Sequence, residues 1–85
     1  MQYFVYIIEC SDGIFYTGIT WSLRKRIEEH NLGLSNFTKS RLPVKLVYFE
    51  NTADKILAAK REKEIKGWGR VKKLKLINGL PRGTK

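Results

Sequence analysis

A β-hairpin near the start of the chain constrains the fold most strongly. Residues 3–9 are rich in β-branched and aromatic side chains, and residues 14–19 repeat this character after the sequence Ser11-Asp12-Gly13. Two such runs joined by a short glycine-containing turn are typical of two antiparallel strands. The N-terminal part of the chain is therefore expected to form a hairpin.

The register of this hairpin decides which side chains share a face of the sheet. With a two-residue turn at Asp12-Gly13, Tyr6 and Tyr16 would lie on opposite faces. With a three-residue loop that ends in a left-handed Gly13, Tyr6 pairs with Gly18 and the two tyrosines share a face. We predict the second register, which also leaves open space beside Tyr6 because Gly18 has no side chain.

One more strand and three helices are expected in the rest of the chain. The order β-β-α-β-α-α indicates an α+β fold, with a small three-stranded, mostly antiparallel sheet flanked by helices. A chain of 85 residues has room for one thin core, so residues 1–85 are expected to form a single domain. The expected elements after the hairpin are a helix over 22–31, a strand over 44–50, and helices over 53–66 and 70–78.

Local signals predict where the helices begin and which sides are buried. Ser22 is expected to cap the first helix, and Asn51 or Thr52 the second. In the second helix, Glu62 falls between the apolar Ala58 and Ile65, so a carboxylate lies on or beside the buried side. A carboxylate there is costly unless it is paired or bound to a metal ion. The apolar positions expected to face inward in the last helix are Val71, Leu74 and Ile77.

The charge balance indicates a polyanionic partner. Lys and Arg number 17 against 8 Asp and Glu, which gives a net charge of +9, and nucleic acid is the commonest polyanion. A surface that serves only solubility is the alternative. The apolar N-terminal stretch is too short for a membrane span and lacks the basic start of a signal peptide. Together with a lone cysteine, Cys10, this predicts a soluble cytoplasmic protein without a disulfide.

Several segments together resemble the GIY-YIG nuclease superfamily in its small standalone, single-domain branch. The resemblance covers nearly the whole chain, and the spacing of the segments is more specific than any one of them. The segments are Phe4-Val5-Tyr6, Tyr16-Thr17-Gly18, Leu23-Arg24-Lys25-Arg26-Ile27 with His30-Asn31, and Arg61-Glu62-Lys63-Glu64-Ile65-Lys66-Gly67-Trp68.

The resemblance implies roles for individual residues. Tyr6 and Tyr16 match the tyrosines of the two family tripeptides, and Glu62 matches the lone metal-binding glutamate. The resemblance thus implies one Mg²⁺ or Mn²⁺ ion on Glu62, a chemistry in which waters and substrate oxygens fill the other positions. The further matches are Gly18 with the closing glycine, Arg26 with the helix arginine, and His30 with a position that holds histidine or tyrosine.

The chain also departs from the family pattern. The first tripeptide is Phe-Val-Tyr in place of Gly-Ile-Tyr, and Ile19 stands where some relatives place a lysine. Asn78 is the one candidate for a family asparagine that follows the glutamate helix. Larger relatives carry a separate nucleic-acid-binding domain. None is expected within these 85 residues, so substrate affinity and specificity are expected to have another source.

The expected activity is metal-dependent endonuclease cleavage of phosphodiester bonds, in DNA rather than RNA. Arg26 would pair with a phosphate oxygen through its planar guanidinium. The resemblance favours Tyr6 as the base that takes a proton from water, whereas the residues alone permit Tyr6, Tyr16 or His30. A tyrosine has an ordinary pKa of about 10, so it needs neighbouring positive charge to act as a base near neutrality.

Structural explanations compete with each of these roles. Glu62 could form a helix salt bridge with Lys66 or Lys55, and Trp68 is expected to anchor the core. The chain could also be a non-catalytic nucleic-acid-binding module, or a subunit that gains specificity from a protein partner; a monomer is expected. Beyond Gly18, the candidate contacts to nucleic acid are the cluster Arg70, Lys72, Lys73 and Lys75 and the loop residues Thr38, Lys39 and Arg41.

Overall fold

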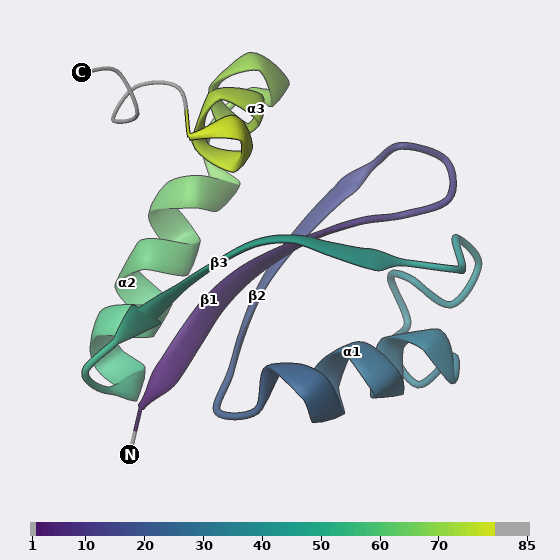
Figure 1. Cartoon of the computed structure of the whole chain (residues 1–85), viewed down its shortest axis with the longest axis horizontal. Coiled ribbons are helices and arrows are strands. Elements are labelled where there is room, and N and C mark those ends of the chain that lie inside the picture. Colours follow the sequence, from purple (N-terminus) through teal and green to yellow (C-terminus); the bar gives the residue numbers. More distant parts are fainter. Residues whose placement is uncertain (1, 80–85) are drawn as a thin grey trace.

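Six elements of secondary structure follow one another in the predicted β-β-α-β-α-α order (Figure 1). The computed structural model describes residues 2–79. The three strands form one antiparallel sheet, which confirms the α+β fold. No helix within the described part of the chain is long and apolar enough to cross a membrane. The elements are β1 (Tyr3–Glu9), β2 (Phe15–Thr20), α1 (Leu23–Asn31), β3 (Lys45–Thr52), α2 (Lys55–Lys66) and α3 (Arg70–Asn78).

Strand β1 lies in the middle of the sheet, between β2 and β3. The predicted register of the hairpin is confirmed, because Tyr6 pairs with Gly18 and Ile8 pairs with Tyr16. The loop that produces this register ends at Gly13, whose φ of 85° lies in the left-handed region. Because β1 is covered on both faces and paired on both edges, its central residues are fully buried.

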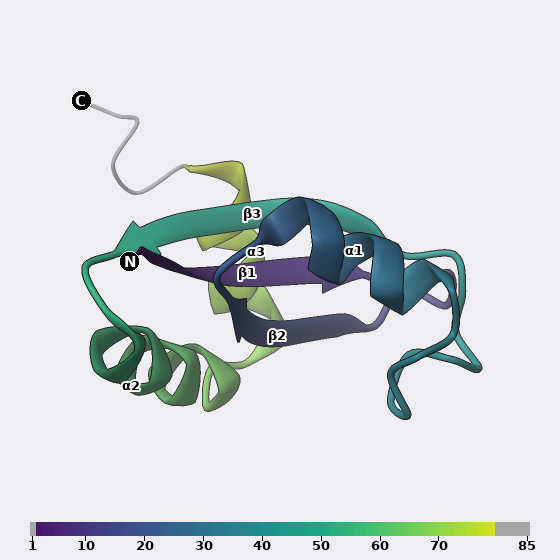
Figure 2. The ribbon, with the colours of Figure 1, turned by 90° about the horizontal axis from the view of Figure 1, so that it is seen from below.

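The two faces of the sheet carry separate cores. Val5 and Ile7 of β1 face α2 and α3 and pack with Ala58 and Ile65 of α2. The alternating residues Tyr6 and Ile8 face the opposite way and pack against α1. Figure 2 shows α1 in front of the sheet and α3 behind it, and Figure 1 shows α2 and α3 together on the side away from α1. Strand β2 is left at an edge, between these two layers.

The expected start of α2 was wrong. Asp54 caps the helix, accepting a hydrogen bond from the backbone N–H of Leu57 at 2.9 Å. Asn51 and Thr52 do not cap it because they belong to β3, where they pair with β1. The strand continues past position 50 because a partner strand satisfies its backbone groups, which a local pattern does not reveal.

The predicted inward side of α3 was wrong at Val71, whose side chain is 68% exposed. The helix packs against the core through Leu76 and Ile77, in its last turns. Trp68, just before the helix, packs against the same core as predicted. A nine-residue helix that approaches the sheet with its C-terminal half leaves its first turn in solvent, whatever its apolar pattern.

Candidate active site

Three ring side chains meet on the α1 side of the sheet. The Tyr6 hydroxyl lies 2.9 Å from Nε2 of His30, and these residues are 1% and 0% exposed. The His30 ring also meets Tyr16 edge to face, with ring centroids 5.4 Å apart. The sheet register and the last turn of α1 thus bring the two tyrosines and the histidine into one cluster.

Thr38 completes a buried chain of hydrogen-bonding groups behind Tyr6. Its Oγ1 atom lies 2.7 Å from Nδ1 of His30, and the residue is 0% exposed. The expectation that Thr38 touches a backbone phosphate was therefore wrong, because no phosphate could reach a fully buried hydroxyl. The sequence contains no signal for this contact, since Thr38 lies in an irregular loop eight residues after His30.

Gly18 makes room for the Tyr6 hydroxyl. A Cβ atom at this position would lie 2.5 Å from the Tyr6 hydroxyl oxygen and 2.7 Å from Cζ. Both distances are shorter than van der Waals contact, so only glycine permits this packing. The open space beside Tyr6 that the hairpin register predicted is therefore occupied by the tyrosine's own hydroxyl.

Arg26 lies one turn of α1 before His30. Its guanidinium donates to Glu29 Oε1 at 3.0 Å and also acts on the Tyr6 hydroxyl. Burial raises the pKa of Tyr6 to about 12, although the hydrogen bonding and positive charge of Arg26 oppose this rise. Burial, and then the charge of Arg26, lower the pKa of His30, so the imidazole is uncharged at neutral pH.

Glu62 reaches the same region from α2. Its Oε2 atom forms an ion pair with Nζ of Lys66 at 3.2 Å, so the salt bridge that competed with the metal role is present. Lys66 also lies over the Tyr16 ring, with Nζ 5.8 Å from the centroid. The negative charge of Glu62 contributes to the raised pKa of Tyr6, which places the carboxylate within electrostatic reach of the hydroxyl.

The predicted residues Tyr6, Tyr16, Arg26, His30 and Glu62 are thus neighbours, although they come from four separate elements, β1, β2, α1 and α2. They gather beside β2 because this strand is at the edge of the sheet, where side chains from the two helical layers can approach one another. Sequence reasoning missed Lys66 as a neighbour of Tyr16, since only the fold brings α2 to the hairpin.

The loop between α1 and β3 borders this cluster. The ring of Phe37 lies against Tyr16, with centroids 5.2 Å apart, and is 43% exposed. Arg41 lies over the Phe37 ring and forms an ion pair with Asp12 at 3.2 Å, while Lys39 is exposed. Phe37 was not among the predicted site residues, because nothing in its local sequence marks it as a neighbour of Tyr16.

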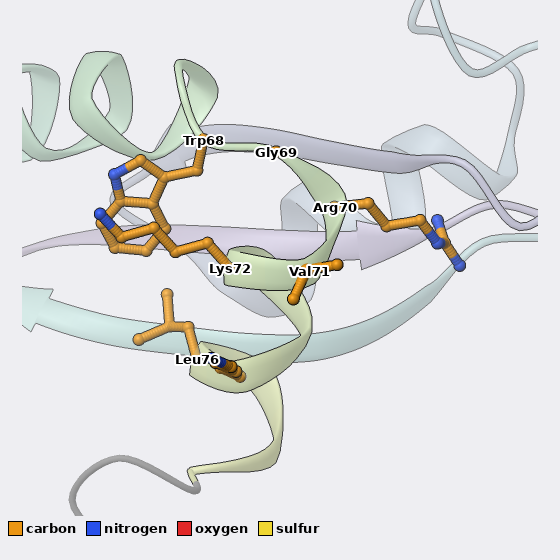
Figure 3. Close-up of a pocket in the computed structure, with 7 residues that line it drawn as sticks. Trp68, Gly69, Arg70, Val71, Lys72 and Leu76 are labelled. Carbon is orange, nitrogen blue, oxygen red and sulfur yellow. The ribbon is translucent and has the colours of Figure 1, made fainter.

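The basic residues of α3 lie on the other side of the sheet from His30. Arg70 is tied to the hairpin, since its Nη1 donates to the carbonyl oxygen of Gly13 at 2.8 Å. Lys72 lies over the Trp68 ring, and Lys73 is partly buried. Figure 3 shows Trp68 and Lys72 together, with Arg70 pointing away. A surface hollow of about 760 Å³ is lined by Trp68, Gly69, Arg70, Val71, Lys72, Lys75 and Leu76. Lys73 is not part of this lining.

The carboxylates near the rings suit one type of metal ion. No three His, Cys, Asp or Glu side chains within residues 2–79 form a group that could hold a metal ion. Glu62 would therefore offer a metal ion a single carboxylate, whereas a zinc site usually needs three or four protein ligands. A lone carboxylate fits Mg²⁺ or Mn²⁺, since Mg²⁺ usually keeps several waters and binds through one or two carboxylates and substrate oxygens.

Comparisons with known proteins identify the family of this chain. Residues 2–75 match the family model of the GIY-YIG catalytic domain. UPF0213 proteins from Staphylococcus aureus strains Mu3 and N315 are 51% identical over 77 residues, covering 89% of this chain and 94% of their own. The solution NMR structure of a UPF0213 protein from Bacillus halodurans is similar with a TM-score of 0.61 and 36% identity, over 98% of this chain and 89% of that one. This chain therefore belongs to the GIY-YIG family of nucleases.

Proposed function

We propose that this protein is a metal-dependent endonuclease that hydrolyses phosphodiester bonds in nucleic acid, with DNA preferred over RNA. The observation that carries the proposal is the meeting of Tyr6, Arg26 and Glu62 at one edge of the sheet. The pKa of Tyr6 responds to both charged groups, so a base, a cation and an acidic metal ligand share one small region. Membership of a nuclease family and a net charge of +9 further support a nucleic-acid substrate.

Tyr6 would take the proton from the attacking water. Its pKa of about 12 disfavours the tyrosinate, so the hydroxyl needs more positive charge than Arg26 alone supplies. A Mg²⁺ or Mn²⁺ ion held by Glu62 would supply that charge and would polarise the phosphoryl oxygens. The ion would displace the ammonium group of Lys66, which now pairs with Glu62.

Arg26 would stabilise the negative charge that develops on the phosphoryl oxygens. Its planar guanidinium can form paired hydrogen bonds to phosphate, and its bond to Glu29 holds it in place. Tyr16 would position the water and the phosphate, whereas the fully buried His30 would act through its hydrogen bond to Tyr6. The substrate would reach these groups along the β2 edge, beside Phe37 and Lys39.

Paired substitutions on α2 test this function. Glu62→Gln removes the acidic ligand but keeps the shape, whereas Glu64→Gln changes an exposed carboxylate two residues away that pairs with Arg61. We expect Glu62→Gln to reduce cleavage of DNA in Mg²⁺ or Mn²⁺ by about a hundredfold or more, as for removal of a principal transition-state contact. Glu64→Gln should cleave at nearly the wild-type rate.

The same assay separates the nuclease from a non-catalytic binding module. Each variant is purified in the same way and incubated with DNA and with RNA, with metal and with a chelator. Equal cleavage by wild type and Glu62→Gln would indicate a contaminating nuclease. Salt-sensitive binding without turnover in any metal would favour the binding module instead.

A further inference from the structure

The hydroxyl of Thr38 and the ring of His30 form a hydrogen-bonded chain that ends at Tyr6. Both distances are short, 2.7 Å from Thr38 Oγ1 to Nδ1 and 2.9 Å from Nε2 to the Tyr6 hydroxyl. The imidazole is uncharged at neutral pH, because burial lowers the pKa of His30. A neutral ring carries one proton, so one ring nitrogen donates and the other accepts. The chain can therefore run in two directions.

The two directions differ in which hydroxyl hydrogen is left without an acceptor. If Nδ1 carries the proton, it donates to Thr38 and Tyr6 donates to Nε2, and the hydroxyl hydrogen of Thr38 is left over. If Nε2 carries the proton, it donates to Tyr6 and Thr38 donates to Nδ1, and the hydroxyl hydrogen of Tyr6 is left over. Arg26 also donates a hydrogen bond to the Tyr6 oxygen, but a guanidinium cannot accept the leftover hydrogen. Within residues 2–79, no other side chain accepts a hydrogen bond from either hydroxyl.

The surroundings of the two hydroxyls decide between these directions. Thr38 is fully buried behind the imidazole, so an unmatched hydrogen there would bear the full cost of lost hydration. Tyr6 is also buried, but its hydroxyl lies beside Arg26 and within electrostatic reach of Glu62, whose side chains are 31% and 22% exposed. An unmatched hydrogen costs less there, because water or a ligand in the site can accept it.

We propose that Thr38 donates its hydroxyl hydrogen to Nδ1 of His30, and thereby holds the ring in the tautomer whose Nε2–H donates to the Tyr6 oxygen. Thr38 is in this sense a positioning residue for the proposed nuclease site. His30 then does not take the proton of Tyr6. It supplies a hydrogen bond that, with the charge of Arg26, stabilises the tyrosine oxygen when it becomes negative. This role rests on the proposed function, whereas the tautomer does not.

Nitrogen NMR of the imidazole tests the tautomer directly. His30 is the one histidine in the chain, so its ring signals are unambiguous. At neutral pH we expect a protonated Nε2 and an unprotonated Nδ1, with this tautomer favoured by on the order of tenfold, the ratio expected for one buried hydrogen bond. A proton on Nδ1 in the wild-type protein would overturn the proposal, and no variant is needed for that result.

Two substitutions test the part played by Thr38. Thr38→Val keeps the shape but removes the hydroxyl, so the preference for the Nε2–H tautomer should fall about tenfold. Thr38→Ser keeps the donor and should retain the wild-type ring signals. An unchanged tautomer ratio in a folded Thr38→Val protein would show that Thr38 does not set it. If Thr38→Val does not fold, the wild-type and Thr38→Ser spectra still decide.

Cleavage kinetics then test the consequence for the site. We expect Thr38→Val to lower kcat about tenfold with little change in KM, and Thr38→Ser to restore it. An unchanged kcat in folded Thr38→Val would overturn the positioning role. A wild-type protein that cleaves no nucleic acid would count against the proposed nuclease. The NMR signals of the His30 ring would still test the tautomer.

Discussion

The Tyr6 hydroxyl is the residue-level feature on which the candidate site depends. It lies against a glycine on one side and a buried histidine on the other, and its pKa is raised to about 12. Packing and hydrogen bonding fix its position, and the neighbouring charges of Arg26 and Glu62 tune its acidity in opposite directions. Changes to any of these neighbours should therefore alter the site without touching a substrate.

Gly18→Ala should disturb Tyr6 directly. The added Cβ would overlap the phenol group, which cannot move aside because it is buried, so we expect a loss of about 1–3 kcal/mol in the free energy of unfolding. Gly67→Ala is the matched control, since its Cβ would meet the Glu64 carbonyl oxygen at an ordinary 3.5 Å. Urea unfolding of the two variants measures the difference, and equal stabilities would contradict the predicted overlap.

His30 should make stability depend on pH in a defined direction. Its pKa is lowered in the folded protein, so below its ordinary value of 6.5 the unfolded chain binds more protons than the folded one. The free energy of unfolding should therefore fall as the pH drops through and below this value. Near His30, Arg26 lowers its pKa and Glu29 raises it, and Tyr6 and Tyr16 contact its ring.

Urea unfolding at about pH 7 and pH 5 measures this dependence, since most carboxylates remain ionised in that range. His30→Gln removes the titrating group and keeps an amide that can form hydrogen bonds. Its stability should change less between the two pH values than that of wild type. An identical decrease in both proteins would assign the effect to other groups.

At the level of the elements, the three-residue hairpin loop and the helix caps determine where the side chains of the candidate site lie. The loop at Ser11-Asp12-Gly13 brings Tyr6 and Tyr16 to the same face, and Asp54 starts α2 so that Glu62 falls in its third turn. Asn31 closes the loop between α1 and β3, because its side chain bonds to both the N–H and the carbonyl of Val44. Each device acts through backbone groups that would otherwise be unsatisfied.

Asp54→Ala should weaken α2. It removes the acceptor for the Leu57 N–H and should cost about 1 kcal/mol of stability, the usual value of an N-cap. Asp54→Asn keeps an acceptor and should remain close to wild type. Thermal or urea unfolding compares the three proteins, and a similar loss in Asp54→Asn would point to the charge rather than to the cap.

Over the whole molecule, positive charge is spread across both sides of the sheet. The loop with Lys39 and Arg41 borders the ring cluster, while α3 presents its basic side chains on the opposite side. Two of these cationic side chains form contacts within the protein, since Arg41 pairs with Asp12 and Arg70 donates a hydrogen bond to the hairpin. The net charge of +9 thus overstates the number of positive side chains that are available to bind a substrate.

Binding to nucleic acid should weaken with salt, and Lys39 should contribute to that dependence. Lys39→Gln is expected to reduce the slope of log affinity against log salt by about one, the change expected for one lost phosphate contact. Lys60→Gln is the control, because residues 60 and 62 lie nearly opposite one another around α2, so Lys60 faces away from Glu62. Fluorescence anisotropy with labelled DNA measures both slopes, and equal reductions would indicate a general effect of net charge.

The secondary-structure elements and the hairpin register were predictable because residues close together in the sequence determine them. Six elements, the left-handed Gly13 and the pairing of Tyr6 with Gly18 followed from turn chemistry and residue pattern. The start of α2 was not predictable in this way, since Asn51 and Thr52 are held by β1, which is distant in sequence. Val71 likewise lies in solvent because of how α3 meets the sheet.

The sequence by itself determined the order of the elements, the hairpin register and the segments typical of the family, because spacing along the chain encodes them. Only the tertiary structure decided that Thr38 lies within hydrogen-bonding distance of His30. The same holds for Lys66, which contacts both Glu62 and Tyr16, and for Phe37, which packs against Tyr16. These contacts join segments whose separation in the chain carries no information about their distance in space. Packing of two helical layers around one edge strand brings them together.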